Sequence, residues 1–283
     1  MSAKILDGKK ITEDIKNELK SEVLHLQEKG IIPGLAVILV GDDTASRIYV
    51  ANKKKACKEI GINSQAFEMP KKTTEKELLE LIIKLNQDDK IHGILVQLPL
   101  PRHIDEENII NAISSKKDVD CFHPENVCKL FVGTGKLLPC TPAGIVEMLK
   151  KNNIEISGKE CVIVGRSNIV GKPMALMLLE ENGTITIAHS KTKNLAEVTK
   201  RADILVVAVG KAGLITQDMV KKDVVVIDVG MNRLENGKIA GDVDFEKVKE
   251  VASAITPVPG GVGPMTIAML MKNAVKAAKQ FKS

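Results

Sequence analysis

The only tyrosine of the chain stands one helical turn before a lysine. Tyr49 and Lys53 lie in the stretch SRIYVANKKKA, within a 283-residue chain that has no tryptophan. The preceding GDDTA supplies residue types that cap the start of a helix. In a helix, positions i and i+4 share one face, so the phenol hydroxyl and the ammonium group can meet. Such a pair could act on a substrate. A solvated basic helix, in which the lysines 53–55 are exposed, explains the same sequence.

A second candidate site is the glycine-containing stretch CVIVGRSNIVGKP at residues 161–173. Gly165, Ser167 and Gly171 form a variant of the dinucleotide-binding fingerprint, with serine where the second glycine is usual. A strand-to-helix turn of this kind points backbone N–H groups at bound anions, although a purely structural turn explains it equally well. Ile169 breaks the G-x-S-x-G pattern of esterases.

The end of the next expected strand indicates which dinucleotide would bind. NAD-binding units carry Asp or Glu there for the ribose hydroxyls, whereas TITIAHSKT ends in His189, Ser190 and Lys191. A hydroxyl and a cation suit a 2′-phosphate, which Arg166 could also reach. The sequence therefore favours NADP over NAD, with an ordinary exposed turn as the alternative. Short-chain dehydrogenases also pair Tyr and Lys at i+4, but their glycine-rich loop precedes that pair, and here it follows.

Helices and strands alternate along almost the whole chain. Apolar runs predict strands in GLAVILVG, INSQAFEMP, HGILVQLPLP, KECVIVG, TITIAH, ADILVVAVG and DVVVIDVG, and amphipathic or capped segments separate most of them. Short apolar runs between helices indicate parallel strands buried on both faces. Asn236-Gly237 predicts a hairpin outside the main sheets. We expect an α/β protein of two α/β domains: residues 1–138 with a C-terminal helix 265–283, and a Rossmann-like domain 139–264.

The composition excludes several classes of protein. Hydrophobic residues make up 44% of the chain and aromatic residues 2%, and the net charge is +5. Dispersed charge with few aromatics favours an anionic small molecule over nucleic acid. No apolar run reaches membrane-spanning length and no signal core opens the chain, so we expect a soluble cytoplasmic protein. We expect reduced thiols and no metal site, because the cysteines form no C-x-x-C pair and Cys121-x-His123 with Cys128 is an incomplete ligand set.

Eight segments together resemble one family. YVANKKKA, GILVQLPLP, KDVDCFHPEN, PCTPAGI, VGRSNIVGKP, DVGMNR, GDVDF and TPVPGGVGPMTIAMLMKN, in this order, are similar to bacterial bifunctional methylenetetrahydrofolate dehydrogenase/cyclohydrolase, the FolD family. The resemblance implies NADP-dependent oxidation of 5,10-methylenetetrahydrofolate, then hydrolysis to 10-formyltetrahydrofolate. It also implies an active-site cleft between the two domains and a homodimer that acts on tetrahydrofolate derivatives, polyglutamylated forms included.

The resemblance also implies roles for individual residues. Lys53 matches the lysine essential to hydrolysis, Tyr49 the tyrosine packed against the pterin, and Gln97 the glutamine that tunes the lysine. Asp120 matches the aspartate that binds the amino-pyrimidine edge of the pterin. The remaining matches are listed together: Pro259 and Gly260 on the folate side, and Gly165, Arg166, Ser167, Ser190 and Met231 on the cofactor side, where the residues themselves add Lys191.

One position departs from the family pattern. The family usually has glycine after KDVD, and this chain has Cys121. If that position requires a positive φ, cysteine strains the turn and shifts Asp120. A monofunctional dehydrogenase and a non-catalytic NADP-binding regulatory module remain alternatives to the bifunctional enzyme.

Overall fold

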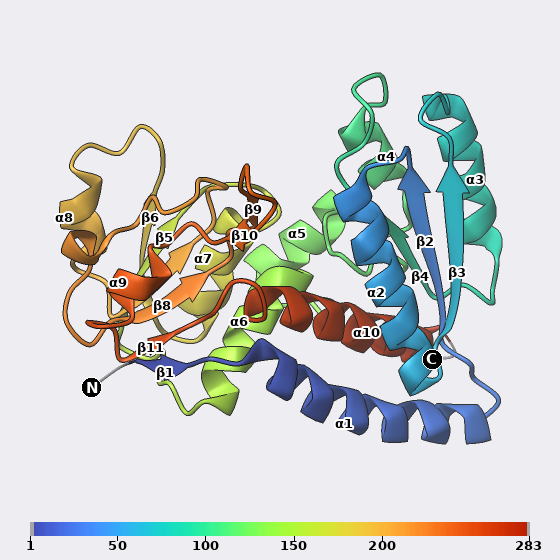
Figure 1. The fold of residues 1–283 in the computed structure, drawn as a ribbon. Helices are drawn as coiled ribbons and strands as arrows, with labels where there is room; N and C mark the ends of the chain where they lie inside the picture. The colour runs from blue at the N-terminus through green and yellow to red at the C-terminus, as the bar shows by residue number, and fades with distance from the viewer. Residues whose placement is uncertain (1–2, 282–283) are drawn as a thin grey trace. The chain divides into compact units, whose positions relative to one another are not determined.

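The computed structural model describes residues 3–281, which divide into two compact units. The three-stranded unit comprises residues 14–140 and 267–281, and the six-stranded unit comprises residues 3–13 and 141–266 (Figure 1). The predicted α/β architecture is confirmed. The division differs from the prediction at the N-terminus, because the strand β1 (Lys4–Ile5) pairs with a strand of the six-stranded sheet and takes residues 3–13 with it.

The three-stranded unit contains a parallel sheet in the order β3-β2-β4. The strands are β2 (Gly34–Val40), β3 (Asn63–Met69) and β4 (Gly93–Val96). Every residue of β2 is buried, as expected of a strand covered on both faces. One face packs against α3 (Glu75–Gln87) and α4 (Glu106–Ala112) through Leu78, Ile82 and Ile109, among other side chains.

The helices of this unit have identifiable start and stop signals. The helix α2 (Thr44–Ile60) begins where the Asp43 carboxylate accepts a hydrogen bond from Ser46 N at 2.8 Å, and it ends at Gly61 in the left-handed conformation. A capping box of Thr74 and Glu77 opens α3. The other helices are α1 (Gly8–Glu28), α5 (Pro124–Phe131) and α10 (Val262–Gln280), of which α1 and α10 cross the division between the units.

The six-stranded unit contains an all-parallel sheet in the order β1-β11-β8-β7-β5-β6. Its strands are β5 (Glu160–Val164), β6 (Thr184–Ala188), β7 (Ile204–Val207), β8 (Val225–Asp228) and β11 (Ala254–Ile255), together with β1. The chain passes from β5 to β6 on one side and then to β7 on the other. This reversal is the switch point at which doubly wound sheets bind ligands, beyond the carboxyl ends of their strands.

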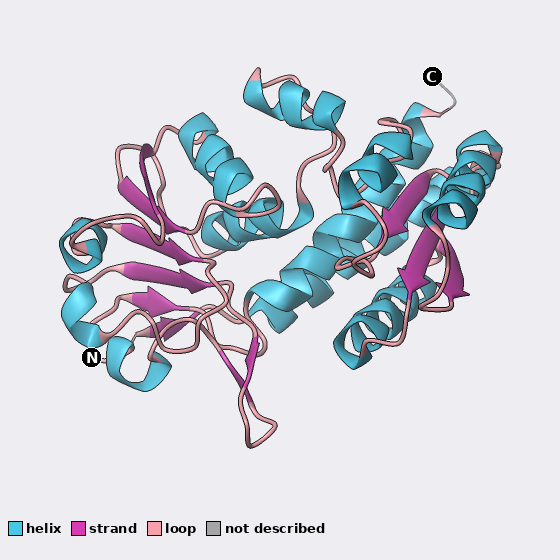
Figure 2. Ribbon diagram, turned by 90° about the horizontal axis from the view of Figure 1, so that it is seen from above, coloured by secondary structure: helices cyan, strands magenta, loops and turns pink. Residues whose placement is uncertain are grey.

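Helices cover both faces of this sheet (Figure 2). They are α6 (Cys140–Lys151), α7 (Gly171–Glu180), α8 (Leu195–Thr199), α9 (Phe245–Val248) and the short 3₁₀ helix η1 (Gln217–Met219). The predicted hairpin is confirmed: β9 (Asn232–Arg233) and β10 (Ile239–Ala240) pair antiparallel outside the main sheet. All five cysteines are unpaired, and four of them are buried. Between residues 3 and 281, no helix is both long and apolar enough to cross a bilayer.

Candidate active site

The helix α2 buries Lys53 while it leaves its lysine neighbours exposed. Lys53 keeps only 6% of its surface, whereas Lys54 and Lys55 lie in solvent. Its Nζ donates a hydrogen bond to Gln97 Oε1 at 3.0 Å. Tyr49, one turn earlier, is half-buried, and burial raises the pKa of its hydroxyl. The interpretation as a solvated basic helix is therefore wrong for Lys53.

Gln97 is held at the carboxyl end of β4, directly beside the central strand. Its backbone N donates to Ile38 O at 2.8 Å, which extends the ladder by one residue. Its side-chain Nε2 donates to Leu98 O at 2.7 Å, so Oε1 faces Lys53 as an acceptor. The amide orientation is thus determined by two partners, and Gln97 fixes the position of the ammonium group.

Asp120 lies in a segment that buried polar groups hold in place. Lys117 is buried and donates to Leu85 O and Asp88 O at the end of α3. Asp118 accepts hydrogen bonds from His123 N and Asn126 Nδ2, each at 2.9 Å. These contacts anchor both sides of the chain that leads to Asp120.

Asp120 and Lys53 interact electrostatically. Burial raises the pKa of Asp120 above its ordinary value, and the positive charge of Lys53 is the largest opposing influence. Asp118 raises the pKa further, while a hydrogen bond with the Cys140 thiol lowers it. A buried cation, an amide and a carboxylate therefore lie together in the three-stranded unit, as the resemblance implied.

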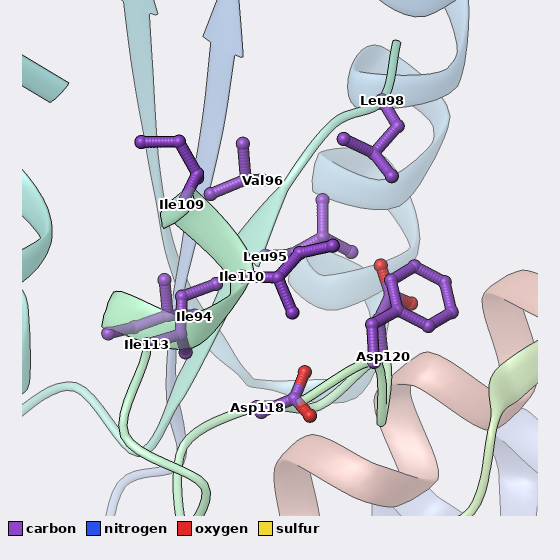
Figure 3. A pocket seen from close by; sticks show the side chains of 10 residues that line it. Ile94, Leu95, Val96, Leu98, Ile109, Ile110, Ile113, Asp118 and Asp120 are labelled. Atoms are coloured by element: carbon purple, nitrogen blue, oxygen red, sulfur yellow. The ribbon is translucent and has the colours of Figure 1, made fainter. Parts of the chain in front are cut away.

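A small pocket opens beside Asp120 (Figure 3). Apolar side chains from β4 and from α4 and its ends line most of it, and Asp118 and Asp120 supply its carboxylates. The lining is therefore mostly apolar, with carboxylates at one part of it. Asp118 and Cys140 are polar neighbours of Asp120 that were not predicted, although both belong to the recognised motifs KDVD and PCTPAGI.

Cys121 confirms the suspected backbone requirement after KDVD. Its φ is +60°, in the left-handed region that favours glycine. Its side chain is buried, and its Sγ lies 3.8 Å from Asp118 O. Whether the cysteine shifts Asp120 relative to glycine-containing relatives stays a prediction.

The glycine loop of the six-stranded unit joins β5 to α7. Gly165 has φ +132°, and a Cβ there would lie 2.3 Å from Ala208 O, so only glycine fits. Ser167 Oγ accepts hydrogen bonds from Val170 N at 3.2 Å and Gly171 N at 3.3 Å. Ser167 Oγ thus engages the amides of Val170, just before α7, and of Gly171, its first residue, while anion binding by this loop stays a prediction.

The other predicted cofactor residues gather at the same edge of the sheet or close to it in sequence. Gly165 N donates to Ala188 O at 2.8 Å, so the loop after β5 lies beside the turn after β6 that carries Ser190 and Lys191. Both of these side chains are exposed, as is Arg166. Met231 follows β8 and is 49% exposed. A hydroxyl and two cations are therefore available to an anionic ligand.

The two predicted folate contacts of this unit lie in the loop before α10. The Val258–Pro259 peptide bond is cis, and Gly260 has φ +111°. The Gly260 carbonyl accepts a hydrogen bond from Gly8 N at 3.1 Å. Pro259 and Gly260 thus belong to the six-stranded unit, whereas Tyr49, Lys53, Gln97 and Asp120 belong to the other. Among residues 3–281, no cluster of His, Cys, Asp and Glu could hold a metal ion.

Comparisons with known proteins agree along the whole chain. Residues 6–120 match the tetrahydrofolate dehydrogenase/cyclohydrolase catalytic domain, and residues 139–282 match the NAD(P)-binding domain of the same family. The chain is 64% identical to the bifunctional protein FolD of Acetivibrio thermocellus, over 99% of this chain and 98% of that protein. It is 59% identical to the bifunctional protein FolD of Bacillus subtilis, over the full length of both.

Solved structures show the same similarity. The bifunctional enzyme FolD from Campylobacter jejuni superposes with a TM-score of 0.96 at 54% identity, covering 99% of both chains. The FolD enzyme of Trypanosoma brucei, solved with NADP cofactor and an inhibitor, superposes with a TM-score of 0.95 at 37% identity, covering 99% of this chain and 98% of that one. Two domain models, full-length identity and the buried Lys53–Gln97 pair lead to one conclusion: the chain belongs to the tetrahydrofolate dehydrogenase/cyclohydrolase family.

Proposed function

We propose that this enzyme oxidises 5,10-methylenetetrahydrofolate with NADP⁺ and hydrolyses the resulting methenyl compound to 10-formyltetrahydrofolate, using Lys53 for the hydrolysis. The observation that carries the proposal is the buried Lys53, held by Gln97 Oε1 at 3.0 Å beside Asp120. A lysine is buried at such a position for a reason, because removing its charge from water is costly unless partners compensate.

The hydrolysis suits the residues around Lys53. Water attacks the methenyl carbon, a C–O bond forms, a ring C–N bond breaks, and one proton must leave the attacking water. The amine of Lys53 is placed to take that proton. Tyr49 provides a flat surface for the pterin ring, and Asp120 accepts hydrogen bonds from its amino-pyrimidine edge.

The oxidation depends on positioning more than on a strong acid or base, because the folate nitrogen stabilises the cation that forms. NADP⁺, when bound, accepts the hydride that leaves the methylene carbon. Gly165 brings backbone close to the dinucleotide, and Arg166, Ser167, Ser190 and Lys191 suit its phosphates. The end of β6 carries no carboxylate to repel a 2′-phosphate, which supports NADP over NAD. Pro259, Gly260 and Met231 complete the proposed contacts.

The substrate assay is direct. Purified protein is mixed with 5,10-methylenetetrahydrofolate and NADP⁺ or NAD⁺, and the appearance of NADPH or NADH and of 10-formyltetrahydrofolate is followed separately. We expect both products, with NADP⁺ preferred. Accumulation of the methenyl compound without faster hydrolysis would indicate a monofunctional dehydrogenase. NADP binding without any turnover would indicate a regulatory module.

The same proposal extends to the cellular location, the oligomeric state and the form of the folate substrate. We propose that the enzyme works in the cytoplasm as a homodimer and accepts polyglutamylated folates. The unpaired cysteines are consistent with a reducing compartment. Size-exclusion chromatography with light scattering measures the oligomeric state.

A further inference from the structure

The carboxylate of Asp242 is fully buried in the six-stranded unit and surrounded by donors. It accepts hydrogen bonds from three consecutive backbone amides: Val209 N at 2.7 Å, Gly210 N at 3.0 Å and Lys211 N at 2.8 Å. A fourth comes from Asn232 Nδ2 at 2.8 Å. Four donors use the capacity of a carboxylate, so Asp242 is not available to a ligand. Its effect is to fix the shape of the chain around it.

The segments that Asp242 holds are the ones that follow β7 and β8. The amides of 209–211 come directly after β7, and Asn232 comes directly after Met231, the predicted cofactor contact beyond β8. The β7 segment also touches the glycine loop, since a Cβ on Gly165 would lie 2.3 Å from Ala208 O. Asp242 therefore joins two loops at the carboxyl edge of the sheet, next to the switch point.

A second buried carboxylate holds Asp242 itself. Asp228 Oδ1 accepts from Asp242 N at 2.9 Å and from Gly230 N at 2.8 Å, and its Oδ2 accepts from Val243 N at 3.0 Å. Gly241 is required between them, because a Cβ there would lie 1.9 Å from Asp228 Oδ2. The two carboxylates and the backbone amides form one connected network.

The direction of the cofactor across the sheet assigns a role to this network. In the proposed function, the 2′-phosphate end lies at the end of β6, beside Ser190, and the pyrophosphate lies over the loop after β5. The opposite half of a dinucleotide then continues across the switch point, over the ends of β7 and β8. Those are the segments that Asp242 holds.

We propose that Asp242 is a positioning residue for the nicotinamide half of the cofactor. It acts through the backbone of 209–211 and through Asn232, and it does not touch the ligand. This inference rests on the proposed function of the six-stranded unit. Asparagine at this position would turn an NH₂ group toward amides that need an acceptor, so the loop would lose its shape even where the fold survives.

The test compares two reactions of the same enzyme, because hydrolysis of the methenyl compound consumes no nicotinamide. For Asp242→Asn we expect the KM for NADP⁺ to rise or the dehydrogenase kcat to fall by about tenfold or more, the equivalent of losing about one hydrogen bond to a charged group. Hydrolysis should stay within about twofold, since the changed bonds lie outside the three-stranded unit. NADPH fluorescence enhancement on binding gives a readout that needs no turnover.

A matched control separates positioning from general stability. Asp203, at the amino edge of the same sheet, accepts from Glu160 N at 2.8 Å and from Lys221 Nζ at 2.6 Å. Asp203→Asn should lower the melting temperature without changing NADPH affinity. Should Asp242→Asn fail to fold, Asn232→Ala removes one donor from the same carboxylate and should weaken NADPH binding by about threefold or more.

Two results would overturn the inference. One is an unchanged NADPH affinity and NADP⁺ KM in folded Asp242→Asn and Asn232→Ala. The other is a loss of hydrolysis equal to the loss of oxidation, with NADPH affinity retained. A wild-type protein that binds NADPH but turns over no folate would instead refute the proposed function, and the binding titrations would still test Asp242.

Discussion

The two units use buried charge in opposite ways. In the three-stranded unit, the buried Lys53 interacts electrostatically with Asp120, whose carboxylate lines a small pocket. In the six-stranded unit, the buried carboxylates of Asp228 and Asp242 accept hydrogen bonds from backbone amides, and the residues proposed to touch the cofactor are largely exposed. In the proposed function, charge supplies chemistry in the first unit, whereas in the second unit it determines backbone shape.

The contrast fits the two reactions proposed for the enzyme. Hydrolysis requires a group that takes a proton, so a side chain with a suitable nitrogen must be present. Hydride transfer requires orientation, so a backbone of the right shape suffices. Substitutions in the first unit should therefore change the rate of a chemical step, and substitutions in the second should change binding or stability.

Replacing Lys53 should give the largest effect. Lys53→Met keeps an apolar stem but removes the amine, and we expect hydrolysis of the methenyl compound to fall by about 10²-fold to 10⁴-fold. Oxidation should fall far less, because it uses the lysine only for orientation. Stopped-flow absorbance of the methenyl compound measures the hydrolysis. Lys54→Met, at the exposed neighbour, is the control. Equal loss of both activities with folate still bound would remove the distinction between the two units.

Replacing Gly165 should mainly affect binding and stability. Gly165→Ala places a Cβ against Ala208 O at a φ of +132°, and we expect it to cost about 3 kcal/mol in the free energy of unfolding and to abolish NADPH binding. Gly158 also has a positive φ, +72°, but open space around it, so Gly158→Ala should cost only about 1 kcal/mol and leave binding intact. Urea titration measures the free energy of unfolding of both variants. A similar loss of unfolding free energy in the two variants would mean that the close approach of Gly165 to Ala208 O is unimportant.

The smallest effect concerns pH. Burial raises the pKa of Asp228 from 3.8 to about 6, so ionisation is disfavoured in the folded state. Wild-type protein should therefore gain stability as the pH falls through about 6. The Asp228→Asn variant has no carboxyl group at this position, so it should lack this gain. The difference in unfolding free energy between them should grow by about 1 kcal/mol between about pH 7.5 and about pH 5.

Asp203 provides the control for this measurement. Its hydrogen bond with Lys221 lowers its pKa, so the stability that Asp203 contributes is present above its ordinary pKa and is lost only at more acidic pH. The difference between wild type and Asp203→Asn should therefore stay nearly constant over the same range. If the difference in unfolding free energy between wild type and Asp228→Asn also stays constant, the pKa of Asp228 is not raised in the folded protein.

The sequence predicted most of what depends on local patterns. Continuous apolar runs identified parallel strands, because a strand buried on both faces has apolar residues at successive positions. The i, i+4 spacing of Tyr49 and Lys53 could be recognised because residues four positions apart lie on the same face of a helix. The recognised motifs then placed Gln97 and Asp120 in the same unit, and the structure agrees.

What the sequence did not show depends on contacts between distant segments. The two-residue strands β1 and β11 are too short for any periodic pattern. The hydrogen bonds from Val170 N and Gly171 N to Ser167 Oγ depend on the exact course of a loop. Asp242 lies in a recognised motif, GDVDF, but its partners are backbone amides some thirty residues earlier in the chain, and amides carry no residue signature.

The pairing of Lys4 with Ala254 has a consequence for biosynthesis. Of the strands in the six-stranded sheet, β1 is synthesised first, and its neighbour β11 is synthesised last. The backbone groups of β1 stay unpaired until residues 254–255 have been made, and closing so long a loop is slow compared with local helix formation. A nascent chain interrupted before residue 254 would expose the free edge of β8 as well, so the synthesis of β11, not the emergence of β1, sets the moment at which this sheet can be completed.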